Sequence, residues 1–120
     1  MPSRDPASEA RYFSEAIGGE LAFTIEAFGA RVAMVELSEG SPALLFADHL
    51  DGERPILVYR VADLDAAITE LKASGCEVSE PFGIPHGPCA EIEAPGGHRL
   101  AIYELTRPEA PEHLAGRRDF

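Results

Sequence analysis

The sequence predicts an α+β protein made of two βαβββ modules whose sheets form a curved, mixed-sheet cup. The main observation is an internal repeat. A helix that opens at an aspartate, closes at a glycine and precedes three short strands occurs twice, after Asp5 and after Asp63. One helix cannot cover both faces of such a sheet, so each module is expected to leave one face open. Two open faces set side by side would make a small-molecule site.

Length and composition fit one packed domain. The chain has 120 residues, of which 45% are apolar, which is enough for a single hydrophobic core. The repeat divides this domain into module one at 1–49, a linker at 50–54, module two at 55–105 and a tail at 106–120. The tail contains prolines and is expected to be extended.

Net charge and cysteine content limit which partners the protein is expected to bind and in which cellular compartment it is expected to lie. The formal net charge is −11, which disfavours nucleic acid and anionic membranes because phosphate contacts need clustered Lys and Arg. No apolar run approaches the roughly 20 residues of a membrane span. We therefore expect no membrane partner. Cys76 and Cys89 form no CxxC pair and are too few for a disulfide scaffold, so we expect a cytoplasmic protein.

Module one is expected to open with a helix over Asp5–Ile17, which Gly18 ends. Leu21, Phe23 and Ile25 then alternate with small or polar residues, which is the periodicity of a strand. Two further strands and a turn complete the module: Arg31–Leu37, the turn Glu39–Pro42, and Ala43–Ala47.

The strand that should precede the first helix is nearly missing. Only Met1–Arg4 come before Asp5, so the first strand of module one is predicted to be truncated or missing. Either the start of this sequence lies inside the natural gene, or these residues form a stub of the strand.

Module two is expected to repeat the plan. Asp63 is a good N-cap for a helix at Leu64–Ser74 with one apolar stripe, which Gly75 ends. The strands and the loop around this helix are Pro55–Val61, Cys76–Ser79, the loop Pro81–Gly87, Pro88–Glu93 and Arg99–Leu105.

Three stretches resemble the vicinal oxygen chelate superfamily, which contains glyoxalases, bleomycin-resistance proteins and extradiol dioxygenases. Val58–Ala67 resembles its strand-to-helix entry, and Ala94–Leu100 resembles the turn before its last strand. Tyr12-Phe13 with Gly18-Gly19 resembles its first-helix signature. The resemblance covers most of Ser3–Glu104 and implies two βαβββ modules. The tail is similar to bacterial members of this group, which implies no particular chemistry.

The resemblance also implies a divalent metal held by His, Glu or Gln, because Fe, Mn, Ni and Zn need nitrogen or oxygen lone pairs. The family's ligand positions fall here on Ile56, on Ala101 and near Leu45. None of these side chains can donate a lone pair. A slip of one residue would not help, because neighbouring side chains point to the opposite sheet face. We therefore expect no metal and no cofactor.

Strand alternation defines a candidate ligand site. Ile56, Val58 and Arg60 share one face of their strand, and Ala101 and Tyr103 share one face of the last strand. The alternate residues, expected to pack under the helix and seal the core, are Leu57, Tyr59, Val61, Leu100 and Ile102. The candidate ligand-binding residues are Arg60, Tyr103, His86, Leu45, Ile56, Val58, Ala101, Phe23 and Met34, and no catalytic residue is assigned.

Two of these residues carry the polar chemistry. Arg60 would pair with a carboxylate or phosphate of a ligand, or alternatively with one of the many acidic side chains. His86, in a Pro- and Gly-rich loop, would be a hydrogen-bond donor, a general base or a surface residue. Phe23, Met34 and Leu45 would form an apolar wall of the site or belong to the core.

Three functions remain open from the sequence. The first is a metal-free small-molecule-binding protein, similar to bleomycin-resistance proteins. The second is a metal-dependent glyoxalase- or dioxygenase-like enzyme with a displaced site, against which the apolar ligand positions argue. The third is a structural or regulatory dimer with an incidental pocket. A homodimer is expected, because the short first strand leaves an edge that a second chain could cover.

Overall fold

The computed structural model describes residues 1–40 and 42–120, and these divide into two compact units. The first unit contains Met1–Glu53 together with Leu114–Phe120, and the second contains Arg54–His113. Each unit has one open sheet with a helix packed on it. The α+β class and the two βαβββ modules are therefore confirmed.

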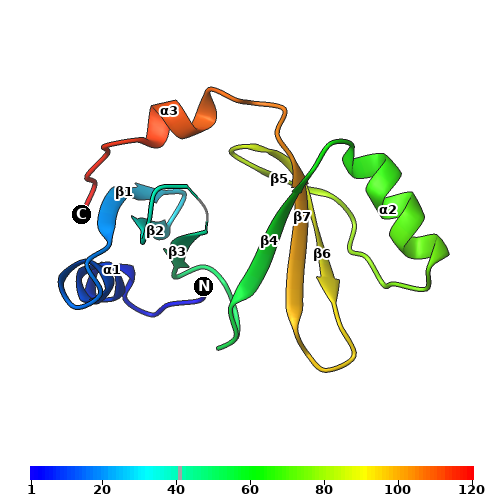
Figure 1. Cartoon of the computed structure of the whole chain (residues 1–120), viewed down its shortest axis with the longest axis horizontal. Helices are drawn as coiled ribbons and strands as arrows, with labels where there is room; N and C mark the ends of the chain where they lie inside the picture. Colours follow the sequence, from blue (N-terminus) through cyan, green and yellow to red (C-terminus); the bar gives the residue numbers. More distant parts are fainter. Residues whose placement is uncertain (41) are drawn as a thin grey trace. The chain divides into compact units, whose positions relative to one another are not determined.

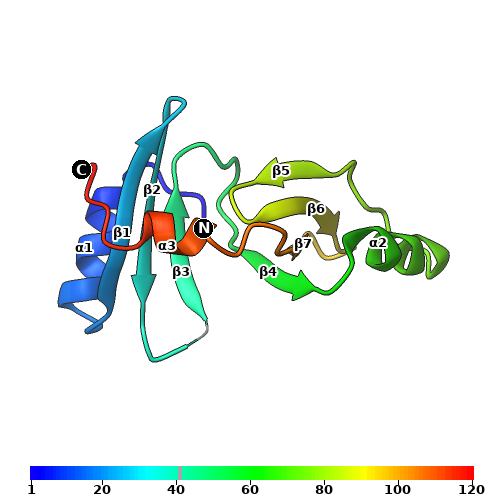
Figure 2. The ribbon, with the colours of Figure 1, turned by 90° about the horizontal axis from the view of Figure 1, so that it is seen from above.

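The first unit is organised around α1 (Pro6–Glu15). Asp5 caps this helix, since its carboxylate accepts a hydrogen bond from the backbone N–H of Ser8 at 3.3 Å. The helix ends two residues before the predicted end at Ile17. Figure 2 shows α1 lying along one face of the sheet, where Ala10 is buried against it.

The sheet of the first unit is an antiparallel meander of β1 (Glu20–Ala27), β2 (Ala30–Glu36) and β3 (Ala43–Ala47). Its helix-covered face contributes Ala33, Val35 and Phe46 to a core cluster with α1. The predicted turn Glu39–Pro42 includes Ser41, which lies outside the described residues.

A bulge interrupts the alternation predicted for the first strand. Leu21 pairs with Val35, whereas Phe23 pairs with Met34, so the register shifts at Ala22. Leu21 consequently packs with the α1 cluster, and Phe23 points to the opposite face with Met34. The prediction that Leu21 and Phe23 share one face is wrong, because the extra residue reverses the faces on either side of it.

The first strand of module one is a stub. Pro2 makes an isolated parallel bridge to Ala47, with hydrogen bonds from the Ser3 N–H to the Ala47 carbonyl at 2.9 Å and from the Ala47 N–H to the Met1 carbonyl at 3.0 Å. In the part of the chain that the structure describes, the first sheet thus has three full strands and the second has four. The predicted truncation is confirmed.

The second unit forms a mixed sheet in the order β4-β7-β6-β5, which Figure 1 shows with α2 beside it. The β4 and β7 strands run parallel, and the other pairs are antiparallel. Its elements are β4 (Ile56–Val61), α2 (Leu64–Ala73), β5 (Phe82–Ile84), β6 (Gly87–Glu93) and β7 (Arg99–Glu104).

Two carboxylates hold the start of α2. Asp63 caps the helix by accepting from the Ala66 N–H at 3.0 Å, and Glu104 at the end of β7 accepts from the Leu64 N–H at 2.9 Å. The second bond ties the helix to the strand that it covers. A core cluster of Leu64, Ile68, Ala90 and Ile102 lies between α2 and the sheet.

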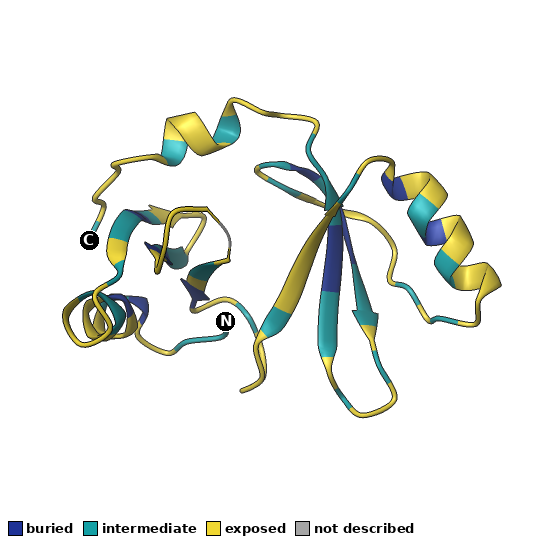
Figure 3. Ribbon diagram, viewed as in Figure 1, coloured by how far each residue is buried: buried dark blue, intermediate teal, exposed yellow. Residues whose placement is uncertain are grey.

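The helix covers β6 and β7 rather than β4. Leu57 and Tyr59, which were predicted to seal the core, are 55% and 54% exposed, and only Val61 of the three predicted β4 residues packs against the described core cluster. Figure 3 shows β4 largely exposed beside the buried centre of β7. Alternation assigned their face correctly, but it does not give the width of the area that a helix covers.

Strand β5 lies inside the predicted loop Pro81–Gly87. Its residues Phe82–Ile84 pair with the start of β6 through a tight turn that holds His86. The strand predicted at Cys76–Ser79 is reduced to one bridge between Val78 and Ile92. Proline and glycine in the segment favoured a loop, and pairing with β6 overrides that local preference.

The tail is not simply extended. It contains α3 (Ala110–Leu114), and Arg118 then forms a parallel bridge to Thr24 of β1. No helix in residues 1–40 and 42–120 is long and apolar enough to span a membrane.

Gly87 is predicted to be required for the close approach between the start of β6 and the end of β7. It has φ of +149°, and a Cβ there would lie 2.2 Å from the Glu104 carbonyl oxygen. Gly87→Ala should lower the free energy of unfolding by about 2 kcal/mol or more, measured by urea denaturation. Gly83→Ala is the matched control, because a Cβ at Gly83 meets nothing within 4 Å. Equal effects of the two substitutions would contradict the close approach.

Candidate functional site

The face of the second sheet that points away from α2 collects most of the predicted site residues. Ala90 and Ile102 pack toward α2, so Cys89, Ala101 and Tyr103 point to the other side. We call this side the open face. Strand pairing arranges it in three cross-strand rows: Arg60–Tyr103–Cys89–Phe82, Val58–Ala101–Glu91, and Ile56–Arg99–Glu93.

Small buried residues occupy the middle of the open face and larger ones its borders. Ala101 is 5% exposed between Val58 and Glu91, and Cys89 is buried between Tyr103 and Phe82. Val58 is 56% exposed. An apolar molecule on this face would therefore meet the exposed side chain of Val58, whereas Ala101 and Cys89 offer it little surface.

His86 lies against Tyr103. The two rings are 5.8 Å apart at 73°, an edge-to-face contact. The His86 carbonyl accepts hydrogen bonds from the N–H groups of Thr106 and Arg107, each at 3.0 Å, which fixes the β5–β6 turn beside the end of β7. Burial, followed by the nearby charge of Arg107, lowers the pKa of His86 below its ordinary value. The imidazole is thus suited to be a neutral hydrogen-bonding group.

Arg60 extends from the exposed strand β4 next to Tyr103. It makes no salt bridge with any acidic residue among those described. With no acidic partner among the described residues, its guanidinium can bind an anion in a bidentate manner.

The predicted residues of module one form a row of their own. Phe23, Met34 and Leu45 are cross-strand neighbours on β1, β2 and β3, on the face opposite the α1 cluster. Phe23 is buried, Met34 is half-buried and Leu45 is exposed. These three belong to the first unit, and the remaining candidates belong to the second.

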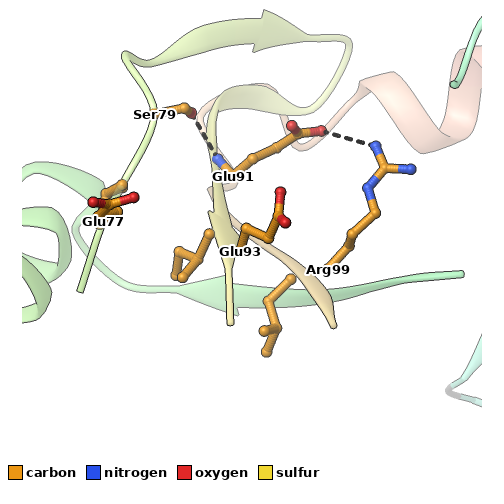
Figure 4. A pocket seen from close by; sticks show the side chains of 8 residues that line it. Glu77, Ser79, Glu91, Glu93 and Arg99 are labelled. Carbon is orange, nitrogen blue, oxygen red and sulfur yellow. Dashed lines mark hydrogen bonds and ion pairs between the residues drawn. The ribbon is translucent and has the colours of Figure 1, made fainter. Parts of the chain in front are cut away.

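A cavity of about 340 Å³ opens beside β6, at the opposite end of the sheet from Arg60. Figure 4 shows Glu91 directed toward Arg99, at 4.0 Å, and Ser79 bonded to the Glu91 N–H at 2.9 Å. None of the predicted site residues lines it. Its lining residues are Glu77, Val78, Ser79, Glu91, Ile92, Glu93, Arg99 and Leu100.

Sequence reasoning missed this cavity. The signal present was the alternation of Glu91 and Glu93 around Ile92, which places two carboxylates on the open face of β6. The contribution of Glu77 was not foreseeable, because it depends on the bridge between Val78 and Ile92. Three carboxylates and one guanidinium give the cavity a negative charge that suits a cationic group.

Comparison with known proteins identifies the fold of this chain. No family model and no curated protein matches the chain. Methylmalonyl-CoA epimerase from Mycobacterium tuberculosis is 18% identical, with 91% of this chain and 86% of that chain aligned and a TM-score of 0.73. The chain has the vicinal oxygen chelate fold. A hypothetical protein from Bacillus halodurans is 15% identical over 86% of this chain and 88% of that one, with a TM-score of 0.68.

The vicinal oxygen chelate fold confirms the resemblance seen in the sequence at the level of fold. The sequence resemblance implies a metal held on the strands. The residues that it places at the ligand positions do not fit one, because Ile56, Ala101 and Leu45 are aliphatic. In the described residues, no group of three or more His, Cys, Asp or Glu side chains is placed to hold a metal ion.

His86 is predicted to make the free energy of unfolding depend on pH. Its folded-state pKa lies below the ordinary 6.5, so acidification protonates the unfolded chain first. Stability present above pH 6.5 is then lost as the pH falls through the folded-state value. His86→Gln should lose less stability than the natural sequence between neutral pH and pH 5, measured by urea denaturation. If His86→Gln loses as much stability as the natural sequence over this range, the prediction is wrong.

Proposed function

We propose that this chain is a metal-free small-molecule-binding protein whose ligand lies on the open face of the second sheet. The observation that carries the proposal is the register of β4 and β7. Ile56 and Val58 lie beside Ala101 on the face without α2, where metal-binding members of the fold would need donors. Aliphatic side chains at these positions favour apolar contact with a ligand instead of coordination.

The polar groups on this face favour an anionic ligand with an apolar or aromatic body. Arg60 supplies a cation without a salt-bridge partner among the described residues, and Tyr103 and His86 supply hydrogen-bonding groups next to it. Phe82 ends the same row with an exposed ring. A ligand with a carboxylate or phosphate at Arg60 and an apolar body over Val58 would use all these groups together.

We also propose that the protein is a cytoplasmic homodimer. The free thiols of Cys76 and Cys89 support a reducing compartment. The stub at Pro2, which makes a single bridge to Ala47, supports a partner chain at that edge of the first sheet.

Arg60 is the residue whose loss should weaken binding most. A thermal-shift screen of aromatic carboxylates and glycopeptide-like compounds should find ligands, and Arg60→Ala should weaken an anionic hit by about 1.5–3 kcal/mol. Arg60→Lys should retain part of the affinity, and Arg11→Ala, the same charge change on α1, should retain all of it. If Arg60→Ala and Arg11→Ala bind equally well, the ligand does not lie on the open face.

The metal prediction is tested separately. Elemental analysis of protein purified without chelators should find Fe, Mn, Ni and Zn well below one ion per chain, because the family positions lack donors. Addition of these metals should not raise the melting temperature. A stoichiometric metal that survives dialysis would favour the enzyme with a displaced site.

A further inference from the structure

The open face of the second sheet has a cation at one border and carboxylates at the other. Arg60 lies on β4, in the row of Tyr103. Glu91 and Glu93 lie on β6 and point to the same side of the sheet, because they alternate with Ile92, which packs toward α2. One face therefore offers a group that binds anions and, separately, groups that bind cations.

The segment that precedes β5 adds a third carboxylate beside β6. Val78 makes an antiparallel bridge to Ile92 and packs with it against the α2 cluster, so the neighbours of Val78 point to the open face. Glu77 is consequently the cross-strand neighbour of Glu93. Like charges at opposite positions destabilise a sheet. Neither of these two carboxylates forms an ion pair with a described residue, so the chain leaves their repulsion uncompensated.

The cavity of about 340 Å³ lies at these carboxylates. Figure 4 shows Glu91 and Glu93 directed to the side of β6 on which Arg99 lies, with Glu77 on the segment beside the strand. Arg99 is the one cation among the described lining residues, and its guanidinium is 4.0 Å from the Glu91 carboxylate, a long contact for an ion pair. One guanidinium thus faces three carboxylates, and the cavity keeps a negative charge.

An organic cation fits this cavity better than a metal ion does. No group of three or more His, Cys, Asp or Glu side chains in the described part of the chain is placed to hold a metal ion. An ammonium carries three N–H donors and a guanidinium five, so either can reach carboxylates that do not converge on one point. The volume also leaves room for the part of a molecule that carries such a group.

The spacing of the two charged borders determines the length of a ligand that would use both. Neighbouring strands lie about 4.8 Å apart, and each residue advances the strand by about 3.3 Å. From the strand register, the Cα atom of Arg60 is therefore about 12 Å from that of Glu91. The line between them crosses β7 between Tyr103 and the small, buried Ala101, where the ring of Tyr103 can flank an extended molecule.

We propose that the ligand of the open face is an elongated zwitterion, which places its carboxylate or phosphate at Arg60 and an ammonium or guanidinium group among Glu77, Glu91 and Glu93. This inference rests on the proposed function and deepens it, because it adds a second charged subsite and so defines the class of ligand. The cation would separate the facing carboxylates of Glu77 and Glu93 and remove their repulsion.

The first test compares three probes by isothermal titration calorimetry at low ionic strength, where exposed charges are screened least. The probes are para-(aminobutyl)benzoate, which carries both charges, para-butylbenzoate, which lacks the amine, and phenylbutylamine, which lacks the carboxylate. The zwitterion should bind about fivefold more tightly than para-butylbenzoate, because each exposed carboxylate contributes a small amount. Equal affinities of these two probes, both weakened by Arg60→Ala, would overturn the zwitterion and leave the proposed function standing.

The second test changes the charge of the cavity. Glu93→Gln should reduce the advantage of the zwitterion to about twofold and leave the affinity for para-butylbenzoate unchanged. Glu70→Gln is the matched control, because it removes the same charge from an exposed position on α2 and should keep the full advantage. An advantage that survives Glu93→Gln intact, or that falls equally in Glu70→Gln, would overturn the cavity as the cation subsite.

Two further outcomes separate this inference from the proposed function. Binding of phenylbutylamine that is weakened by Glu93→Gln, without measurable binding of either carboxylate probe, would overturn the proposed anion site at Arg60 and the zwitterion with it. Binding of none of the three probes at about 1 mM would overturn the zwitterion, whereas the proposed function would still be decided by the thermal-shift screen and Arg60→Ala.

Discussion

The parallel pairing of β4 with β7 is the constraint on which the second module depends. The chain leaves β4 at one edge of the sheet, crosses through α2 to β5 at the other edge, and returns through β6 to β7 beside β4. The Glu104 carboxylate fixes the start of α2 at the end of β7, and the helix then covers β7 and β6 on one side. The other side is left to residues that alternate with the core, among them Arg60 and Tyr103. The candidate site is thus a consequence of the connection.

The first module has a much shorter parallel strand at the corresponding place. Its parallel neighbour to β3 is reduced to a bridge at Pro2, and its opposite edge, at β1, is covered by Gly116–Phe120 instead of by a strand from its own half. The β1 edge of the first sheet is therefore covered, which limits uncontrolled pairing with other chains there, whereas in the described residues the stub bridges β3 at Ala47 alone. Residues Gly116–Phe120 also complete the core, because Phe120 packs against the cluster of residues under α1.

Much of this arrangement could be predicted from the sequence, because the signals are local. Asp5 and Asp63 mark helix starts through their short side chains, and a period of two was enough to assign the faces of β4 and β7. The predictions fail where contact with a segment distant in the sequence determines the local structure. The bulge at Ala22, strand β5, the exposure of Leu57 and the cavity beside β6 all depend on which element lies alongside, and no local pattern carries that information.

The bond between the Thr24 hydroxyl and Phe120 joins residues 96 positions apart. During synthesis, β1 emerges from the ribosome early, but the segment that covers its edge emerges only after the whole second module has been made. Domains usually fold in the order in which they are translated. Here the first unit stays incomplete until residues 116–120 have been made, and contacts of such long range slow its folding. The nascent chain therefore carries an uncovered β1 edge while the second module is made, which is the interval in which a chaperone would be needed most.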